Sequence, residues 1–349
     1  MNMSDESGQK TPVPVPAATA TAHPETFTSA DHLAQLTNLR SRLSQKLIGL
    51  DTLVERLLVA LLTGGHLLIE GPPGVAKTRT VNQFAQLLDM SFVRVQATPD
   101  LLPADLTGTD MFEQNTGTFS FMPGPLFNHI ILIDEVNRAP PKVQSALLEA
   151  MGEQQITTGG VTRRLQAPFL VAATQNPIEH EGTYPLPEAQ LDRFMFFINL
   201  DLPGLENERR ILDQVLSEHT SGCADPALAP IGNIVSIMQA RQSVEEIHVS
   251  AAVRDYIVRL VGATRGHGLA GKTAKSITQA ASPRASIYLA MAARARAWLD
   301  GRDHTTPDDI AALAPDILSG RIALDYRAQA AGTTARQLVQ EIIAATPQV

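Results

Sequence analysis

The sequence is poor in cysteine and in long hydrophobic runs, and each shortage excludes a class of protein. The single cysteine, Cys223, cannot form a disulfide within the chain, which suits a reducing cytoplasm. The longest unbroken apolar run, Leu57 to Leu62, is far too short to span a bilayer. Asp5 and Glu6 stand near the N-terminus with no apolar block after them, so no secretory signal is expected. We therefore expect a cytoplasmic protein that does not insert into membranes.

Positive charge is also scarce, since 28 Lys and Arg residues face 36 Asp and Glu residues, for a formal net charge of −8. General nucleic-acid binders present a basic face, so this balance argues against nucleic acid as a partner. It does not exclude a local basic loop. The rest of the composition, 44% hydrophobic and 18% charged over 349 residues, fits a globular protein with two domains, or with one domain and a lid.

Residues 1–29 differ from the rest of the chain. They are rich in Pro, Ala and Thr and lack apolar periodicity, so we expect a disordered N-terminal tail. Order is expected from about residue 30, where leucines begin to recur at helical spacing. A second helix is predicted from Asp51 to Leu62, with Gly64-Gly65 as its C-cap signal.

Short apolar strands then alternate with helices. Five strands are predicted, at residues 66–70, 92–95, 130–133, 169–173 and 194–199. This alternation indicates a parallel sheet covered on both faces. After Pro203 only helices are predicted, at about residues 206–217, 250–264, 283–299, 307–318 and 333–344. The sequence thus predicts an α/β core of residues 30–203, followed by an all-helical lid domain of residues 204–349.

Two hairpins are predicted to interrupt the core. Residues 108–121 contain the turn Asn115-Thr116-Gly117 between short runs of β-forming residues. Residues 155–165 contain Gly159-Gly160 in the same setting. Each hairpin is either surface decoration or an insertion that faces the pore of a ring-shaped motor.

A glycine- and proline-rich loop follows the first strand and opens a helix. It consists of Gly71, Pro72, Pro73, Gly74, Val75, Ala76, Lys77 and Thr78, and we count the next residue, Arg79, with it. Such a loop directs successive backbone N–H groups at phosphate oxygens. Lys77 would reach the β- and γ-phosphates, and the Thr78 hydroxyl would hold Mg²⁺. The pattern predicts a P-loop ATPase that binds ATP and Mg²⁺. Ala76 stands where glycine is usual, and it fits if its φ is negative.

A second stretch, residues 266–273, matches the P-loop pattern at every position. It follows a predicted helix rather than a strand, and no apolar helix opens after Lys272, so nothing would direct its N–H groups at a phosphate. We interpret it as a flexible glycine loop.

The predicted strand of residues 130–133 runs into two carboxylates, Asp134 and Glu135. Adjacent residues at the end of a strand diverge, so the two can take different roles. Asp134 is expected to hold Mg²⁺ through water, and Glu135 to orient and deprotonate the attacking water. A solvated acidic turn is the alternative, which the quality of the apolar run and the P-loop upstream disfavour.

Three further polar residues are candidates for the same chemistry. Asn176 can donate to the γ-phosphate and accept from the attacking water, or it can be a simple Asn-Pro turn residue. Arg193 can meet charge on the γ-phosphate of a neighbouring subunit, or it can form a salt bridge on the core surface. Arg284 lies in the first turn of a helix capped by Ser282, where the helix dipole disfavours a cation. It should therefore have an anionic partner, which ATP bound between core and lid would supply.

With these residues in place, the chain resembles the AAA+ superfamily and, within it, the MoxR ATPases. The resemblance covers about residues 30–345. It rests on motifs in a fixed order, at residues 65–71, 134–139, 174–177, 188–194, 263–265 and 282–285. A P-loop alone is common to many ATPases, whereas this ordered set is specific. MoxR P-loops often carry alanine before the lysine, as at Ala76.

By that resemblance, Asn176 is the sensor 1 residue, Arg193 the arginine finger and Arg284 the sensor 2 arginine, while Ile48 and Gly49 line the adenine pocket. The two hairpins resemble the helix-2 insert and the pre-sensor-1 hairpin of this group. The segment of residues 266–281 is longer than usual in the family.

The resemblance also implies partners. MoxR proteins are similar to chaperone-type motors, which form homo-oligomeric rings, typically hexamers. They act with a protein that carries a von Willebrand factor A domain, and they mature protein complexes or insert cofactors into them. The protein client itself is not implied.

Two other functions stay open at this point. One is a nucleic-acid-translocating or chelatase-type motor. The scarcity of basic residues on the hairpins argues against it, since the first hairpin has none and the second has only Arg163 and Arg164. The other is a nucleotide-binding scaffold without turnover. The joint presence of Lys77, the acid pair and Arg193 argues against it.

Overall fold

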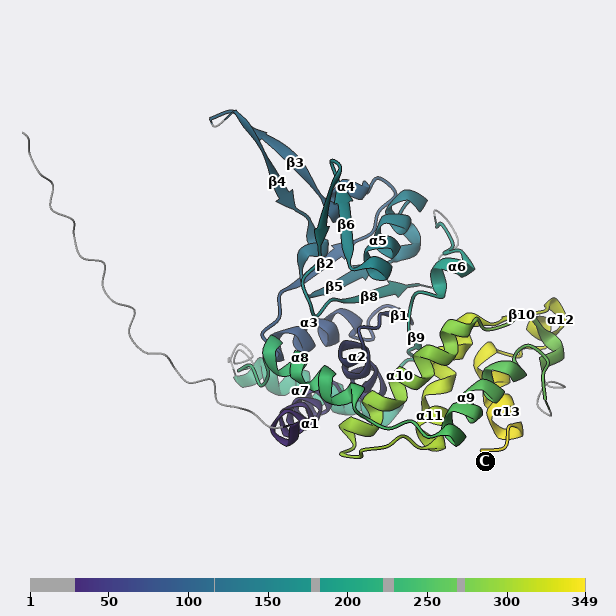
Figure 1. Cartoon of the computed structure of the whole chain (residues 1–349). Helices are drawn as coiled ribbons and strands as arrows, with labels where there is room; N and C mark the ends of the chain where they lie inside the picture. The colour runs from purple at the N-terminus through teal and green to yellow at the C-terminus, as the bar shows by residue number, and fades with distance from the viewer. Residues whose placement is uncertain (1–28, 116, 177–182, 222–228, 269–273, 349) are drawn as a thin grey trace, which may run out of the picture.

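The computed structural model describes residues 29–115, 117–176, 183–221, 229–268 and 274–348 (Figure 1). The predicted tail of residues 1–29 lies outside this part, except for Ser29, where the first helix begins. Cys223 lies outside it as well.

Five parallel strands form the central sheet, in the order β2-β5-β8-β1-β9. They are β1 (Leu67–Glu70), β2 (Phe92–Gln96), β5 (Ile130–Asp134), β8 (Leu170–Gln175) and β9 (Phe196–Asn199). All five predicted strands are confirmed, and their bounds differ from the predicted ones by at most two residues. Every residue of β5 is buried, because helices cover both faces of the sheet.

The register of the sheet brings the carboxyl ends of β1, β5 and β8 to one edge. Leu68 of β1 pairs with Ala173 of β8, and Leu132 of β5 pairs with Ala172 of the same strand. The P-loop after β1, the acid pair at the end of β5 and Asn176 after β8 therefore meet over this edge. Parallel α/β sheets bind their ligands there.

Helices cover the sheet on two sides (Figure 1). On one side lie α1 (Ser29–Lys46), α2 (Asp51–Thr63) and α3 (Lys77–Leu87), in a hydrophobic cluster that includes Ile69. On the other side lie α4 (Pro103–Thr107) and α5 (Pro141–Glu153), in a cluster that includes Leu68. Neighbouring residues of one strand thus belong to opposite layers, as the alternation of strand side chains requires.

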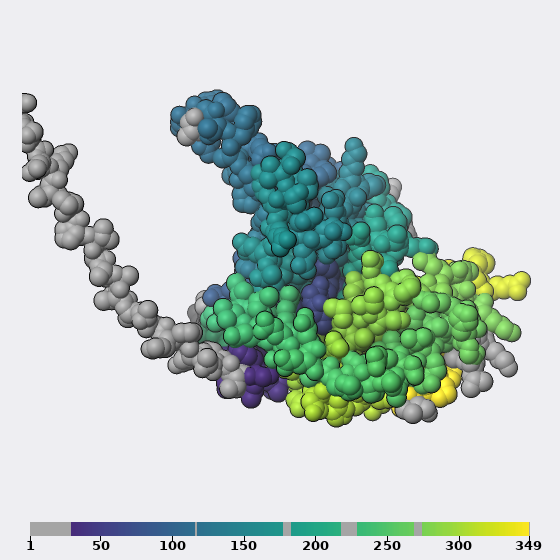
Figure 2. Space-filling model, viewed as in Figure 1, coloured from purple at the N-terminus to yellow at the C-terminus, as the bar shows by residue number. Residues whose placement is uncertain are grey.

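Both predicted hairpins form. β3 (Gly108–Glu113) pairs with β4 (Thr118–Pro123), and β6 (Gln155–Thr158) pairs with β7 (Val161–Arg164). The β3–β4 hairpin projects from the body of the molecule as a knob in the space-filling view (Figure 2).

Seven α-helices follow β9 in the described part of the chain. They are α7 (Leu205–Ser221), α8 (Ile234–Glu245), α9 (Ala251–Ala263), α10 (Pro283–Leu299), α11 (Pro307–Leu318), α12 (Tyr326–Ala330) and α13 (Ala335–Ala345). The five predicted helices are confirmed, and α8 and α12 are additional. The region is not exclusively helical, however, because β10 (Ile277–Gln279) pairs with β11 (Ala323–Leu324). Strands of this length show no alternating pattern in a sequence.

One hydrophobic cluster runs from the sheet into the C-terminal helices. It joins Leu57 of α2 with Leu289 of α10 and Leu313 of α11. Packing alone therefore draws no boundary at residue 203, and the division into core and lid at that residue stays a proposal. Among the helices of the described residues, none combines the length and the apolar character needed to cross a bilayer.

His66, just before β1, is buried in its neutral form. Its Nδ1 accepts the N–H of Val171 at 3.1 Å, so Nε2 carries the proton and donates to the Met151 carbonyl at 3.3 Å. Burial lowers the pKa of His66 from 6.5 to about 4, although the hydrogen bond to Met151 opposes this decrease. The uncharged ring thus holds β1, β8 and the end of α5 together.

We expect His66 to make the fold acid-sensitive between pH 6.5 and pH 4. In this window the unfolded chain binds a proton at this position and the folded chain does not. The free energy of unfolding therefore falls as the pH falls, by up to about 3 kcal/mol, and above the window the stabilisation is complete. The free energy of unfolding would be measured with denaturant at a series of pH values. Within this window its pH dependence should be weaker in His66→Gln than in the wild type, by the uptake of about one proton. Equal dependences in the two proteins would contradict the assignment.

Candidate functional site

The P-loop lies between β1 and α3 and borders two adjoining cavities. The phosphate-side cavity, of about 390 Å³, is lined by Lys77 and Thr78 together with Asp134, Glu135 and Asn176. The base-side cavity, of about 380 Å³, is lined by Ile48 and Gly49. The residues that line both are Gly74, Val75, Ala76 and Arg79. Gly71 and Pro73 line the phosphate-side cavity, and of the predicted loop residues only Pro72 lines neither.

Ala76 caps α3 with a left-handed backbone, at a φ of +56°. The expectation that alanine fits here with a negative φ was therefore wrong. A Cβ in this conformation crowds the next carbonyl, which costs about 1 kcal/mol relative to glycine. The helix holds the residue in place, since the Ala76 carbonyl accepts both the N–H and the hydroxyl of Thr80 at 3.0 Å. The loop keeps its shape despite the alanine.

Lys77 lies over the loop that precedes it, and its Nζ donates to the Gly71 carbonyl at 2.7 Å. Burial lowers the pKa of Lys77, and the carboxylates of Asp134, Glu135 and Glu70 oppose this decrease. The ammonium group is thus held in a partly desolvated cavity by negative charge. A nucleotide phosphate there would favour its charged form further.

Asp134 and Glu135 are joined by one hydroxyl group. Thr174 Oγ1 donates to Asp134 Oδ1 at 3.1 Å and accepts the N–H of Glu135 at 3.0 Å. Glu135 has a φ of +56°, which turns the chain out of the strand direction at this residue. The two neighbouring carboxylates therefore have different surroundings within one cavity.

Two side chains of β2 complete the acid pair, and sequence analysis missed both. Arg94 Nε lies 2.5 Å from Asp134 Oδ2, and Gln96 Nε2 donates to Glu135 Oε2 at 2.9 Å. They reach the pair because β2 lies next to β5, with Gln96 opposite Asp134. The available signal was the alternation of polar Arg94 and Gln96 along an otherwise apolar strand.

Thr78 and Asp134, the residues expected to hold Mg²⁺, line the same cavity. They offer a hydroxyl and a carboxylate, which are donors that Mg²⁺ accepts. Within the described ranges, no three His, Cys, Asp or Glu side chains gather into a metal cage. The donor set therefore fits an ion that takes its other ligands from water and from nucleotide phosphates. Such an ion would neutralise charge on the β- and γ-phosphates.

The base-side cavity is bordered by α7, the first helix after the core. Gly49 has a φ of +78°, and a Cβ at this position would lie 2.9 Å from the side-chain nitrogen of Asn207 on α7. The positive φ favours glycine here, and any larger residue would also displace the Asn207 side chain.

Asp316 of α11 and Arg336 of α13 also line the base-side cavity, and sequence analysis missed them. The buried Asp316 carboxylate lies 2.7 Å from Arg336 Nη1 and 2.8 Å from Arg56 Nε of α2. This pairing brings a cation from the last helix to the rim of the cavity. No local sequence pattern reveals it, because the partners come from separate helices.

Asn176 follows β8 directly and lines the phosphate-side cavity. Its predicted neighbour in an Asn-Pro turn, Pro177, belongs to residues 177–182, which lie outside the described part. The position of Asn176 is thus compatible with the predicted contact to a γ-phosphate.

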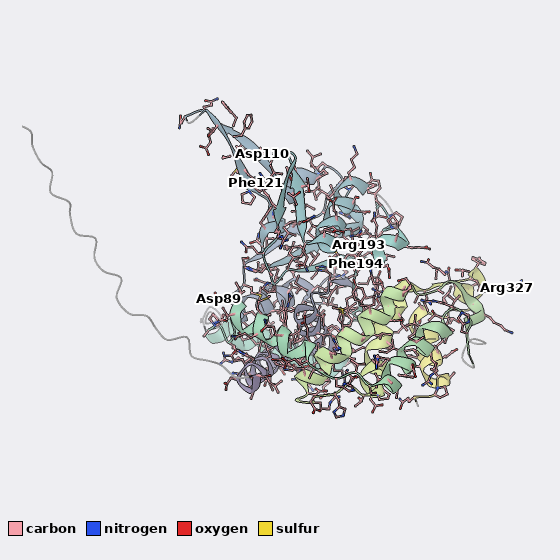
Figure 3. All side chains as sticks on the ribbon, viewed as in Figure 1. Asp89, Asp110, Phe121, Arg193, Phe194 and Arg327 are labelled. Carbon is pink, nitrogen blue, oxygen red and sulfur yellow. The ribbon has the colours of Figure 1, made fainter. Side chains whose placement is uncertain are left out.

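Arg193 and Arg284 lie away from these cavities, where the core meets the C-terminal helices; Figure 3 labels Arg193 there. Arg193 Nη1 donates to the Leu148 carbonyl at 2.6 Å, and Arg284 Nη1 lies 3.2 Å from Asp192 Oδ2. Asp192 is thus an anionic partner of Arg284, and the expected contact with ATP between core and lid stays a prediction. The ion pair forms because α10 begins beside the Asp192 carboxylate, which its N-cap Ser282 also contacts.

The second P-loop-like stretch, residues 266–273, follows α9 with no strand before it, as expected. Its residues 269–273 lie outside the described part.

Comparisons with known proteins agree with this geometry. The model of the ATPase family associated with various cellular activities (AAA) matches residues 66–196, and an AAA lid domain model matches residues 270–342. The chain is 44% identical over 307 residues to Chaperone MoxR1 of Mycobacterium tuberculosis, covering 87% of this chain and 80% of that protein. It is 32% identical over 304 residues to Protein MoxR of Methylorubrum extorquens, covering 81% and 86%. A crystal structure from Cytophaga hutchinsonii, of a protein assigned as an ATPase, aligns with a TM-score of 0.83 at 41% identity, covering 91% of this chain and 96% of that one.

Glu135→Gln should leave nucleotide binding nearly unchanged and slow hydrolysis about a hundredfold, because an amide can accept a hydrogen bond but cannot take a proton from water. Binding would be measured with a fluorescent ATP analogue, and turnover by steady-state phosphate release. Glu153→Gln is the matched control, since Glu153 lies exposed at the end of α5. A variant that turns over at the wild-type rate would remove Glu135 from the role of base.

Proposed function

Because this chain belongs to the MoxR family of AAA+ ATPases, we propose that it works as a ring-shaped chaperone that remodels protein complexes with the energy of ATP. It is an ATP-hydrolysing P-loop enzyme. Ring assembly, the use of Mg²⁺ and the nature of the client belong to the proposal. The observation that carries it is that Arg193 and Arg284 lie together, away from their own P-loop.

The arrangement of the phosphate-side cavity supports a division of roles in hydrolysis. Lys77 binds the β- and γ-phosphates, and Thr78 and Asp134 hold the Mg²⁺ that accompanies ATP. Glu135 takes the proton of the attacking water, and Gln96 holds its carboxylate in place at 2.9 Å. Asn176 orients the water against the γ-phosphate.

The position of the two arginines supports a ring. Phosphoryl transfer needs cations that meet the charge spread over the γ-phosphate oxygens. Arg193 and Arg284 are joined through Asp192, the residue before Arg193, so they present two cations from one region of the surface. In a closed ring each subunit offers this region to the next one, and the pair faces the P-loop of the neighbour. Six subunits would follow the usual form of the family.

The hairpins support a protein client rather than a nucleic acid. The β3–β4 hairpin has no Lys or Arg and exposes apolar side chains, namely Met111, Phe112, Phe119 and Met122. On the β6–β7 hairpin, Arg163 lies 3.8 Å from the centre of the Phe121 ring and 3.5 Å from Asp110 Oδ1. These contacts hold the Arg163 cation against the protein, which leaves little basic surface for phosphates.

Three parts of the proposal rest on family resemblance or composition alone. A partner with a von Willebrand factor A domain and a role in cofactor insertion follow from the resemblance to MoxR proteins. A cytoplasmic location is favoured by the single cysteine.

Arg193→Ala should reduce turnover by about 10³-fold or more, and mixing with Lys77→Ala subunits should restore part of it. In a mixed ring, the first variant contributes an intact P-loop and the second an intact arginine, so some sites become complete. Arg327→Ala on α12 is the matched control, because Arg327 is exposed at the far end of the C-terminal helices (Figure 3). Absence of rescue at every mixing ratio would count against an arginine that acts between subunits.

Single- or double-stranded DNA should change the ATPase rate by less than about twofold, because the hairpins carry only two cations, Arg163 and Arg164, and Arg163 is held against Phe121 and Asp110. Steady-state phosphate release would be measured with and without DNA at low salt. A DNA-stimulated rate that is lost in an Arg163→Ala, Arg164→Ala double variant would instead support the nucleic-acid motor.

A further inference from the structure

The segment Asp192–Met195, which carries Arg193, has neither helical nor strand hydrogen bonding for its carbonyl groups, yet all four carbonyls are satisfied. The carbonyls of Asp192, Phe194 and Met195 accept from the guanidinium of Arg321, the last of them at 3.2 Å. The carbonyl of Arg193 accepts from the Tyr288 hydroxyl at 3.1 Å. Both donors belong to the C-terminal region: Tyr288 lies on α10, and Arg321 ends the short helix η4 (Ser319–Arg321).

Arg321 is committed to this contact with its whole guanidinium group. Its Nε donates to Asp192 Oδ1 at 3.0 Å, and its two terminal nitrogens donate to the three carbonyls of the segment and to that of Ile317. Its side chain is only 1% exposed, and it lies 5.0 Å from the ring centre of Tyr288 and 5.1 Å from that of Phe197. Since all five donors have acceptors, the arginine fixes the path of the segment.

The Asp192 carboxylate ties the same segment to the start of α10. Besides Arg321, it accepts from the hydroxyl of Ser282, the N-cap, at 2.9 Å, and it pairs with Arg284. Arg284 and Tyr288 are one helical turn apart and share a face of α10. The two arginines proposed to serve a neighbouring subunit are thus held by one helix.

We infer that Arg321 and Tyr288 are positioning residues, which join the Arg193 segment to the C-terminal helices so that the two move as one unit. The inference rests on the proposed role of Arg193 and Arg284 at the neighbour's nucleotide. In this arrangement Tyr288 and Arg321 do not touch the nucleotide of either subunit. They act through the backbone of Arg193 and through Asp192.

Tyr288→Phe is the sharpest test, because it removes one hydroxyl and keeps the ring against Arg321. We expect kcat for ATP to fall about five- to tenfold, the equivalent of one hydrogen bond that positions Arg193. KM and the affinity for a fluorescent ATP analogue should stay within about twofold, since the subunit's own cavities are intact. Mixing Tyr288→Phe with Lys77→Ala subunits should raise the rate per intact P-loop, because the Lys77→Ala subunits supply correctly positioned arginines. If Tyr288→Phe instead damaged its own nucleotide site, mixing would not raise this rate.

Tyr256→Phe on α9 is the matched control. Tyr256 is fully buried in the same region, and its hydroxyl has no hydrogen-bond partner among the described residues, so its removal should leave kcat unchanged. The kcat of Arg321→Lys should be lower than that of Tyr288→Phe, because one ammonium group cannot reach all the acceptors of a guanidinium. The same mixing experiment should rescue it.

The outcomes separate this inference from the proposed function. If Arg193→Ala retains full turnover, the proposed role of Arg193 at the neighbouring subunit's nucleotide is wrong. If Arg193→Ala is inactive while Tyr288→Phe matches Tyr256→Phe in kcat, Arg193 serves the site without positioning by Tyr288, and the inference is overturned. A Tyr288→Phe variant that loses nucleotide affinity or cannot be rescued by mixing would overturn it as well.

Discussion

The register of the parallel sheet is the constraint on which the site depends. The segments proposed to bind phosphate, to hold the metal and to activate water are widely separated in the sequence. They meet only because the carboxyl ends of β1, β5 and β8 stop at one edge. A slip of one residue between two strands would turn every side chain of one strand to the opposite layer, exchanging Leu68 with Ile69 between the two hydrophobic clusters. The burial of both faces therefore fixes the geometry of the chemistry at their edge.

The charged groups show how the C-terminal helices share in this site. At one end, Asp316 joins Arg56 of α2 to Arg336 at the rim of the base-side cavity. At the other end, Asp192 joins Arg321 to Arg284. Arg56, Asp316 and Arg321 are the buried members of these ion pairs. Such pairs add little net stability, but loss of a partner would leave a buried member as a costly unpaired charge. They therefore specify one arrangement of the helices on the core, which the shared hydrophobic cluster alone would not determine.

The parts of the site that the sequence could predict are those that depend on neighbouring residues. The P-loop, the acid pair and the five strands each have a contiguous pattern, and the fold confirms the strands. Arg94 and Arg336 were missed because their partners are set by strand order and helix packing, which no local pattern encodes. Arg284 was correctly expected to have an anionic partner from its place in a helix's first turn. Which anion it meets depends on where α10 begins, and this is a tertiary property.

In the proposed ring, the placement of the C-terminal helices would give a physical route between two nucleotide sites. Arg336 on α13 borders the base-side cavity of its own subunit, while Arg284 and the Arg193 segment are held by α10 and η4. α10, α11 and α13 belong to one packed hydrophobic cluster, and such a cluster deforms little. In a ring of the proposed kind, a shift of this packed unit, sheet included, on binding ATP in one site would therefore move the two arginines at the next. Coupling between subunits would then need no separate relay, because one rigid body would contact both nucleotides.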